Sequence, residues 1–189
     1  LKSKLIVSLD DYCRIDYPKG MIVNFSPDSN KLFYNEKKEG YNYLLGLDYV
    51  PIRKEFKDIR IEKKNHIFIM IGGSDVNNLT EIVLNSIKNE QIPKVVVVNN
   101  KKNLKQIEKY TNTKILYKPN DKDLISAMSS SSLAISTASM TLYELSFFNI
   151  PTIIIAIAHN QKIGATQSIN HNLAVSLLDI EKNNWENEI

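Results

Sequence analysis

The chain has 189 residues, 43% of them hydrophobic, which is enough for one sizeable core or for one domain with part of a second. Its 24 Lys and Arg are interleaved with 21 Asp and Glu, and this balance argues against the basic stripe of a nucleic-acid-binding protein. The single cysteine, Cys13, excludes an internal disulfide and favours a reducing, cytoplasmic location.

Metal-binding and membrane-spanning patterns are not found either. Three scattered histidines give no metal-ligand cluster, and the longest purely apolar run falls far short of the ~20 residues of a membrane helix. We therefore expect no metal or other cofactor, no nucleic-acid partner and no membrane span.

The first part of the chain shows a weak strand pattern. Short apolar runs at residues 5–8 and 21–25 predict strands, because Asp, Pro and Gly bound them. The polar stretch between residues 26 and 43 predicts a loop with one helical turn, and residues 43–50 predict an extended segment. A charged stretch then follows, so we place a domain boundary after Phe56. Residues 1–56 are interpreted as the remnant of an N-terminal α/β domain and a hinge.

The two ends of the chain also bear on its organisation. The first residue is Leu1 rather than Met, and residues 183–189 resemble the start of a helix. We therefore expect an interior piece of a longer protein.

A regular alternation of strands and helices begins at residue 65. Residues 67–71 form a continuous apolar run, typical of a parallel strand buried on both faces. Further strands are predicted at residues 94–98, 114–117, 133–136 and 152–158. Helices are predicted between and after them at residues 79–87, 104–110, 121–130, 140–148 and 164–175. Short connections between such elements predict a Rossmann-type, doubly wound parallel sheet over residues 57–189.

The first strand of this sheet runs into Gly72-Gly73-Ser74-Asp75. Two glycines allow the backbone to approach a phosphate closely, and the next helix would offer free N–H groups. Ser74 would add a hydroxyl donor. The alternative is a tight turn in which Ser74 or Asp75 caps the helix.

A second polar segment, Ser136-Thr137-Ala138-Ser139, joins a predicted buried strand to the next helix. It would form a second anion-binding site, because the start of the next helix again offers free N–H groups. Glu144 is expected in the first turn of that helix, where its carboxylate would accept both hydroxyls of a ribose. In the alternative interpretation Glu144 complements the helix dipole and Ser139 caps the helix.

A third strand ends in His159-Asn160-Gln161, which we interpret as a loop whose amides reach ribose or phosphate oxygens. The alternative is an ordinary polar loop. The carboxyl ends of neighbouring parallel strands meet at one edge of a sheet, where open α/β sheets bind ligands. The segments match neither the dinucleotide fingerprint nor a Walker motif.

These segments resemble the UDP-sugar hydrolases of the pseudaminic acid pathway, which are relatives of the MurG-type glycosyltransferases of the GT-B fold. The resemblance is carried by LIVSLDDY, LGLDYVPIRKEF, IMIGGSDVNNL, ISTASMTLYEL and IPTIIIAIAHNQ, at residues 5–12, 45–56, 69–79, 135–145 and 150–161. The family acts on UDP-2,4-diacetamido-2,4,6-trideoxy-β-L-altropyranose. The resemblance therefore implies a GT-B-like fold and a UDP or UDP-sugar ligand.

The resemblance also implies roles for single residues. The diphosphate is expected to be bound by Gly73 and Ser74 and by Ser139, Met140 and Thr141, and Arg53 is expected to approach the uracil or the diphosphate side. The backbone from Lys118 to Asn120 is expected to line the uracil pocket, and Glu144 to bind the ribose. Asn160 and Gln161 are expected to complete the site. For Arg53 the alternative is a surface ion pair with Glu55 or Glu39.

One departure from the family concerns catalysis. The family's catalytic His lies in a Gly-rich loop near the N-terminus, and none of His66, His159 and His171 matches it. We expect no catalytic residue in this chain, which should bind UDP and be inactive alone. Asp10 and Asp11 remain open: they would assist a base or touch the sugar, or they cap a helix or pair with Arg14.

Three functions are therefore carried forward. The first is a UDP-sugar hydrolase of pseudaminic acid or related surface-polysaccharide biosynthesis. The second is a GT-B glycosyltransferase that uses a UDP-sugar donor. The third is a non-catalytic UDP-binding subunit that completes the site of a separate chain, which would supply the N-terminal domain.

Overall fold

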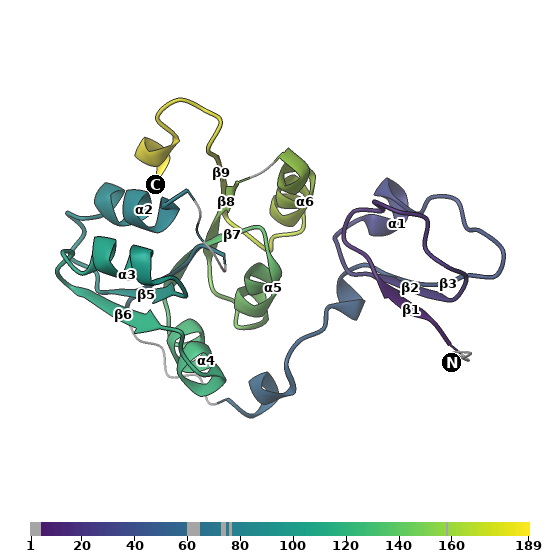
Figure 1. Ribbon diagram of the computed structural model, residues 1–189, viewed down its shortest axis with the longest axis horizontal. Coiled ribbons are helices and arrows are strands. Elements are labelled where there is room, and N and C mark those ends of the chain that lie inside the picture. Colours follow the sequence, from purple (N-terminus) through teal and green to yellow (C-terminus); the bar gives the residue numbers. More distant parts are fainter. Residues whose placement is uncertain (1–4, 60–64, 73–74, 76, 158) are drawn as a thin grey trace. The chain divides into compact units, whose positions relative to one another are not determined.

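The computed structural model describes residues 5–59, 65–72, 75, 77–157 and 159–189, without the side chains of Asp58, His159 and Asn160. The chain divides into two compact units, Leu1–Ile52 and Arg53–Ile189 (Figure 1). This division falls before Arg53, whereas the sequence predicts a boundary after Phe56. Phe56 is only 2% exposed and stacks on Phe148 at 4.8 Å between ring centroids, so this segment packs with the second unit.

Unit 1 contains a three-stranded parallel sheet, in the order β1-β2-β3. Its strands are β1 (Val7–Leu9), β2 (Met21–Asn24) and β3 (Asn42–Leu45). The single helical turn that the sequence predicts is α1 (Ser29–Leu32). The extended segment predicted to residue 50 is shorter than expected, because Gly46 at φ 97° turns the chain into a 3-10 helix, Leu47–Tyr49.

The two faces of the unit 1 sheet differ in burial. Ile22 and Asn24 are 3% and 0% exposed on the face that meets α1, where Ser29 Oγ donates to Asn24 O. Val7 and Leu9 on the opposite face are 51% and 70% exposed. Parallel sheets normally have both faces covered, so this apolar face is unusually open.

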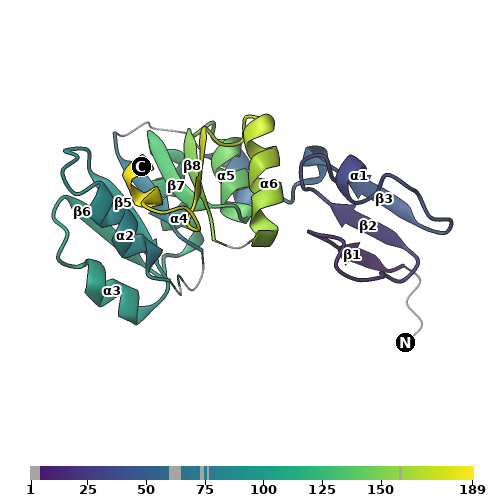
Figure 2. The same ribbon diagram turned by 90° about the horizontal axis from the view of Figure 1, so that it is seen from above.

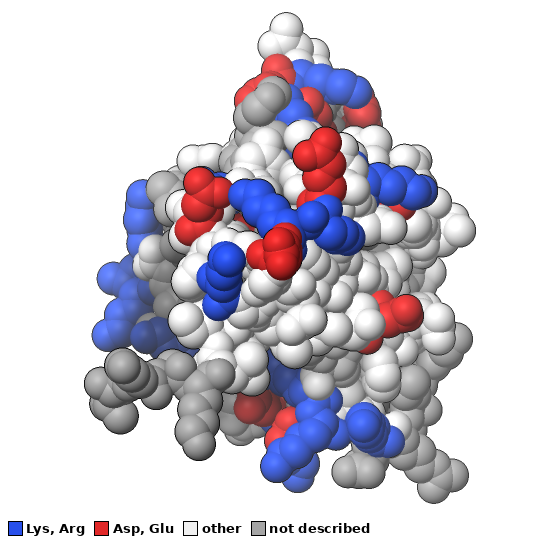
Figure 3. Space-filling view, turned by 90° about the vertical axis from the view of Figure 1, so that its right-hand side faces the viewer, with Lys and Arg blue, Asp and Glu red and all other residues white. Residues whose placement is uncertain are grey.

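Basic and acidic side chains lie close together on the side of the molecule drawn in Figure 3.

Unit 2 contains a six-stranded, fully parallel sheet in the order β6-β5-β4-β7-β8-β9. Its strands are β4 (Ile67–Met70), β5 (Lys94–Val98), β6 (Thr113–Tyr117), β7 (Leu133–Thr137), β8 (Thr152–Ala156) and β9 (Ser176–Asp179). The helices are α2 (Leu79–Ser86), α3 (Lys101–Ile107), α4 (Asp121–Ser129), α5 (Met140–Phe147) and α6 (His159–Asn170), with 3-10 helices at Lys54–Asp58 and Trp185–Glu188. Numbered within the unit, the strand order is 3-2-1-4-5-6, the doubly wound Rossmann order that the sequence predicts.

Helices cover both faces of this sheet, as Figures 1 and 2 show for α2 and α3 on one side and α5 and α6 on the other. Successive side chains along β8 point to opposite faces of the sheet, so they pack into two separate hydrophobic clusters. Ile155 packs with α2 residues and Trp185, whereas Ile154 packs with Leu142 of α5 and Ala165 of α6. No helix among the described residues is long and apolar enough to cross a membrane.

Two predictions near the end of the chain are wrong. Helix α6 spans His159–Asn170 rather than the predicted residues 164–175, so Gly164 lies inside the helix and the helix ends earlier than predicted. The strand β9 is not predicted at all. Only Leu178 of its four residues is fully buried, at 1% exposed, so the strand carries no continuous apolar run.

Candidate functional site

The strand order places a switch point between β4 and β7, at the centre of the unit 2 sheet. Chain connections leave these two strands toward opposite faces, and open α/β sheets bind ligands outside the carboxyl ends of the strands at such a point. Gly72, directly after β4, has φ 56°, and a Cβ atom added there would lie 4.0 Å from Thr137 Oγ1 at the end of β7. The first two polar segments therefore meet at this point. Gly73 and Ser74 lie outside the described residues.

The N-terminus of α2 is already occupied by Asp75. Its Oδ1 accepts from the N–H of Leu79 at 2.8 Å, and its Oδ2 accepts from the N–H of Thr80 at 3.1 Å. Asn103 Nδ2 donates to the same Oδ2 at 2.8 Å. The expectation that this helix offers free N–H groups is therefore wrong for Leu79 and Thr80. The alternative, in which Asp75 caps the helix, is confirmed.

Among the described residues, no carboxylate bonds to the N-terminus of α5 in this way. Ser139 is the N-cap residue, as the alternative interpretation predicts, but its side chain makes no capping hydrogen bond, and the first turn of α5 holds no acidic residue. Met140 is 36% exposed at the first helical position, and Thr141 is 8% exposed. An anion would meet the positive end of the helix dipole here.

Glu144 lies in the second turn of α5, not in the first turn as predicted. The helix begins at Met140, so Glu144 is its fifth residue. A role in complementing the dipole is excluded, because that effect is confined to the first turn. The side chain is only 8% exposed, and its Oε1 lies 2.8 Å from Arg53 Nε. Burial raises the pKa of Glu144, and the charge of Arg53 offsets part of this rise.

Arg53 links two helices that follow different strands. Besides Glu144 it contacts Asp121, the first residue of α4, with 2.5 Å between Nη1 and Oδ1. Its partners are therefore these two carboxylates, rather than the Glu55 or Glu39 of the alternative interpretation. The sequence predicts Asp121 only as the first residue of a helix, and no local signal connects it with a residue 68 positions away.

Lys118 follows β6, the strand at the outer edge of the sheet. It adopts φ 45°, and its N–H donates to Val98 O at 2.9 Å. Asn120 caps α4, since its Oδ1 accepts from the N–H of Asp123 at 2.9 Å. The segment from Lys118 to Asn120 thus leads directly into Asp121, whose contact with Arg53 brings it to the same cluster as Glu144.

Asn160 and Gln161 lie in the first turn of α6, so the predicted loop is wrong. Gln161 Oε1 accepts from the N–H of Ile157 at 3.2 Å, and this bond holds the turn between β8 and α6. The side chain of Asn160 is not among those described. The carboxyl end of β8 is next to that of β7 in the sheet, so this turn lies beside the start of α5.

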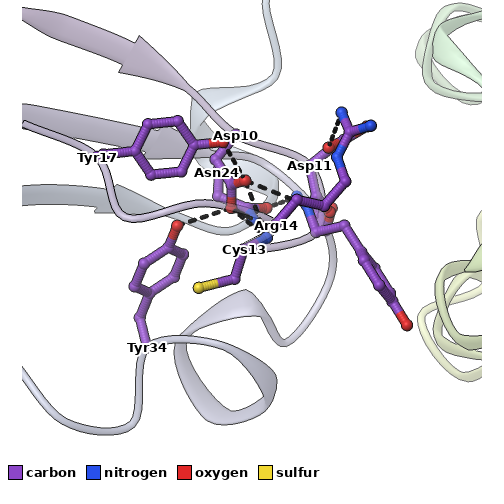
Figure 4. A network of polar contacts seen from close by, with 9 residues as sticks. Asp10, Asp11, Cys13, Arg14, Tyr17, Asn24 and Tyr34 are labelled. Atoms are coloured by element: carbon purple, nitrogen blue, oxygen red, sulfur yellow. Dashed lines mark hydrogen bonds and ion pairs between the residues drawn. The ribbon is translucent and has the colours of Figure 1, made fainter.

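The paired aspartates of unit 1 have structural roles. Asp10 is 3% exposed and accepts hydrogen bonds from Tyr17 Oη and Tyr34 Oη at 2.7 Å each, Asn24 Nδ2 at 2.8 Å and the N–H of Cys13 at 2.9 Å (Figure 4). Burial alone would raise the pKa of Asp10, but these donors lower it below its ordinary value. A carboxylate so fully engaged is a poor base.

Asp11 has the partner that the sequence suggests as an alternative, since its Oδ1 lies 3.0 Å from Arg14 Nη2. His66 is 6% exposed, with Nε2 2.9 Å from Ala127 O, which fixes it inside unit 2. Within the described part of the chain, no three His, Cys, Asp or Glu side chains gather as metal ligands would.

The fold of the chain is that of the GT-B glycosyltransferases. The glycosyltransferase of kitacinnamycin superposes with a TM-score of 0.61 and 10% identity, over 90% of this chain and 44% of its own. MurG of Acinetobacter baumannii superposes with a TM-score of 0.59 and 13% identity, over 97% of this chain and 56% of its own. At these identities the likeness concerns the fold alone.

The sequence relationship is more specific. Over 172 residues the chain is 32% identical to the pseudaminic acid cytidylyltransferase and UDP-2,4-diacetamido-2,4,6-trideoxy-β-L-altropyranose hydrolase of Helicobacter pylori. The match covers 86% of this chain and 31% of that protein, so the chain spans about a third of its relative. The resemblance that the motifs indicate is thereby confirmed. No protein-family model matches the chain.

Proposed function

We propose that unit 2 binds the UDP group of a UDP-sugar at the carboxyl edge of its sheet. One observation carries this proposal. The N-terminus of α5 has no side-chain cap from the described residues, it lies at the switch point beside Gly72, and the buried carboxylate of Glu144 follows one turn later. Anion-binding and hydroxyl-binding groups are thus placed next to each other on one helix.

The chemistry of each group suits one part of the nucleotide. The diphosphate would accept from the N–H groups of Met140 and Thr141 and from the hydroxyl of Ser139. Glu144 lies four residues after Met140 and therefore on the same side of α5. An ionised carboxylate only accepts hydrogen bonds, so it matches the two donors of a ribose.

The other predicted residues extend this site on both sides. The backbone from Lys118 to Asn120 would bind the uracil, because it is tied to the Arg53–Glu144 cluster through Asp121. Asn160 and Gln161 at the start of α6 would close the opposite side, beside β7. Gly73 and Ser74 remain proposed diphosphate contacts on the strength of their place after Gly72.

The reaction that we propose is hydrolysis of the UDP-sugar, as the name of the Helicobacter pylori relative includes such a hydrolase. Water would attack the anomeric carbon, the bond from that carbon to the diphosphate oxygen would break, and UDP would leave. The start of α5 would stabilise the negative charge that develops on the diphosphate. In this proposal the chain holds the leaving group, in the synthesis of pseudaminic acid or a related surface sugar.

A second candidate function is that of a UDP-binding subunit that completes the site of a separate chain. The observation that favours it is the open apolar face of unit 1, with Val7 51% and Leu9 70% exposed. Size-exclusion chromatography with a candidate partner tests this function. A monodisperse chain that forms no complex would remove its support. A glycosyltransferase role would use the same UDP contacts and is tested by transfer of sugar to an acceptor instead of water.

The first test is a calorimetric titration of the chain with UDP, UMP and ADP, using Glu144→Gln as the variant. Glu81→Gln on α2 is the matched control, because Glu81 pairs with Lys109 away from α5. We expect selective binding of UDP that Glu144→Gln weakens about tenfold or more and Glu81→Gln leaves unchanged. A folded chain that binds no UDP, or binds ADP equally well, contradicts the proposal.

A further inference from the structure

Asp121 borders the proposed site without being one of its expected ligand contacts. It is the first residue of α4, and its side chain is 70% exposed. Its Oδ1 nevertheless accepts a hydrogen bond from Arg53 Nη1 at 2.5 Å, while Arg53 Nε lies 2.8 Å from Glu144 Oε1. One guanidinium thus joins an exposed carboxylate on α4 to a buried carboxylate on α5.

The helix α4 does not depend on Asp121 for its cap. Asn120 supplies the cap through its bond from the Asp123 N–H, and Asp123 Oδ2 accepts from Asn120 Nδ2 at 2.9 Å. The bond from Arg53 to Asp121 is therefore additional to the local structure of the helix. The effect of this bond is on the orientation of the Arg53 side chain.

A guanidinium is planar and rigid, so fixing one of its nitrogens fixes the direction of the others. The bond from Nη1 to Asp121 turns the Nε side of Arg53 toward Glu144. The backbone of Arg53 is anchored as well, because Phe56 of the following 3-10 helix stacks on Phe148. With both ends of its side chain held, Arg53 meets Glu144 at little cost in conformational entropy.

We propose that Asp121 is a positioning residue of the nucleotide site, which orients Arg53 and, through it, the carboxylate of Glu144. This role rests on the proposed binding of UDP. When the charge of Asp121 is removed, a positioning role and a purely electrostatic effect of that charge predict opposite changes in the affinity for UDP. A negative charge near a site for an anionic diphosphate repels the ligand, so its removal should tighten binding. Removal of a positioning residue should weaken binding instead.

The experiment is a calorimetric titration with UDP of four versions of the chain: the unchanged protein, Asp121→Asn, Asp121→Glu and Asp123→Asn. Asp123→Asn is the matched control, because it removes the same charge from the same turn of α4 but has no contact with Arg53 in the described structure. We expect Asp121→Asn to weaken UDP binding about five- to tenfold. Asp121→Glu should restore part of the loss, and Asp123→Asn should bind UDP as well as the unchanged protein or slightly better.

Two further results decide the outcome. Thermal unfolding of Asp121→Asn and Asp123→Asn should be alike, because Asp121 does not cap α4 and an Asn at position 123 can still accept from Asn120 Nδ2 through its amide oxygen. This comparison separates positioning from loss of folding. If the unchanged chain binds UDP and both Asn variants bind it equally well or better, the role of Asp121 is wrong and the proposed function stands. If the unchanged, folded chain binds no UDP, the proposed function fails and the role of Asp121 fails with it.

Discussion

Among the described residues, each unit buries one carboxylate, and the surroundings of these two carboxylates differ. Asp10 in unit 1 accepts hydrogen bonds from two phenols, one amide and the backbone N–H of Cys13, all within the unit. These donors lower its pKa despite burial. Glu144 in unit 2 faces a guanidinium that it shares with Asp121, and burial raises its pKa.

This difference separates a structural carboxylate from one that is available for binding. The oxygens of Asp10 are engaged by donors that the fold supplies, so replacing Asp10 should damage unit 1 itself. Glu144 has one cationic partner and lies beside the open start of α5. A buried acid with a raised pKa at a ligand-binding edge is a functional candidate on physical grounds.

The largest expected effect is that of Asp10→Asn on unit 1. The substitution replaces one carboxylate oxygen with an amide NH2 group, so either Tyr17, or Tyr34 together with Asn24, loses its acceptor. Unsatisfied buried donors cost about 1–3 kcal/mol each. We expect unit 1 to lose protection in hydrogen exchange, with a loss of about 3 kcal/mol or more. Asp11→Asn is the control, since Asp11 makes only an exposed ion pair with Arg14. Equal protection in both variants would contradict a structural role for Asp10.

The next effect concerns Arg53, whose removal leaves Glu144 buried without its cation. Arg53→Ala should raise the pKa of Glu144 further and weaken UDP binding by about 2 kcal/mol, or roughly thirtyfold. Arg53→Lys should recover only part of the affinity, because an ammonium lacks the planar fork that meets two carboxylates. Titration calorimetry at neutral pH measures the affinity of both variants for UDP. Unchanged affinity in Arg53→Ala would remove Arg53 from the site.

The pH dependence of unfolding should have opposite signs for the two carboxylates. The folded-state pKa of Asp10 lies below its ordinary 3.8, so Asp10 stabilises the fold above that pH, and this contribution is lost as the pH falls toward the lowered value. The pKa of Glu144 lies above its ordinary 4.5, so its contribution declines as the pH rises from 4.5 through the raised value.

Denaturant unfolding between pH 3 and pH 7 would measure these slopes. We expect Glu144→Gln to remove a decline in stability toward neutral pH, and Asp10→Asn to remove a rise. The same slope in both variants would mean that the two carboxylates do not differ in the way that the structure shows.

The smallest expected effects concern the phenols that donate to Asp10. The bond from Tyr17 to Asp10 raises the pKa of Tyr17 to about 12, and burial together with Asp10 also raises that of Tyr34. Tyr17→Phe should cost about 1 kcal/mol. An alkaline absorbance titration should show one fewer late-ionising phenol in this variant than in the unchanged chain. An ordinary pKa near 10 for Tyr17 would show that its bond to Asp10 is absent in solution.

The fold of unit 2 could be predicted because its signals are local. The strand at Lys94–Val98 has the predicted bounds, since four consecutive valines follow Lys94 and such a continuous apolar run is typical of a strand buried on both faces. The strand β9 was missed for the converse reason: it lies at the sheet edge and buries only Leu178. The start of α6 was missed because His159-Asn160-Gln161 is polar, and polar residues suit the first turn of a helix as well as a loop.

The candidate site was predictable as a set of segments but not as a set of contacts. The sequence places Gly72 and Ser139 at the ends of parallel strands, and Asp75 fits both a phosphate site and a helix cap. Only the structure decides for the cap, because the choice depends on whether the carboxylate reaches the N–H groups of Leu79 and Thr80.

The alternation of strands and helices, the parallel sheet and the relationship to the UDP-sugar hydrolase can all be predicted from the amino-acid sequence, because they follow from apolar periodicity and from short motifs. Which charges meet depends instead on the packing of the folded chain. Arg53, Asp121 and Glu144 come from three separate segments, and their contacts depend on how α4 and α5 pack around the sheet. The residues next to a charged side chain in the sequence do not indicate its ion-pair partner, since ion pairing depends on distance in space rather than on position along the chain.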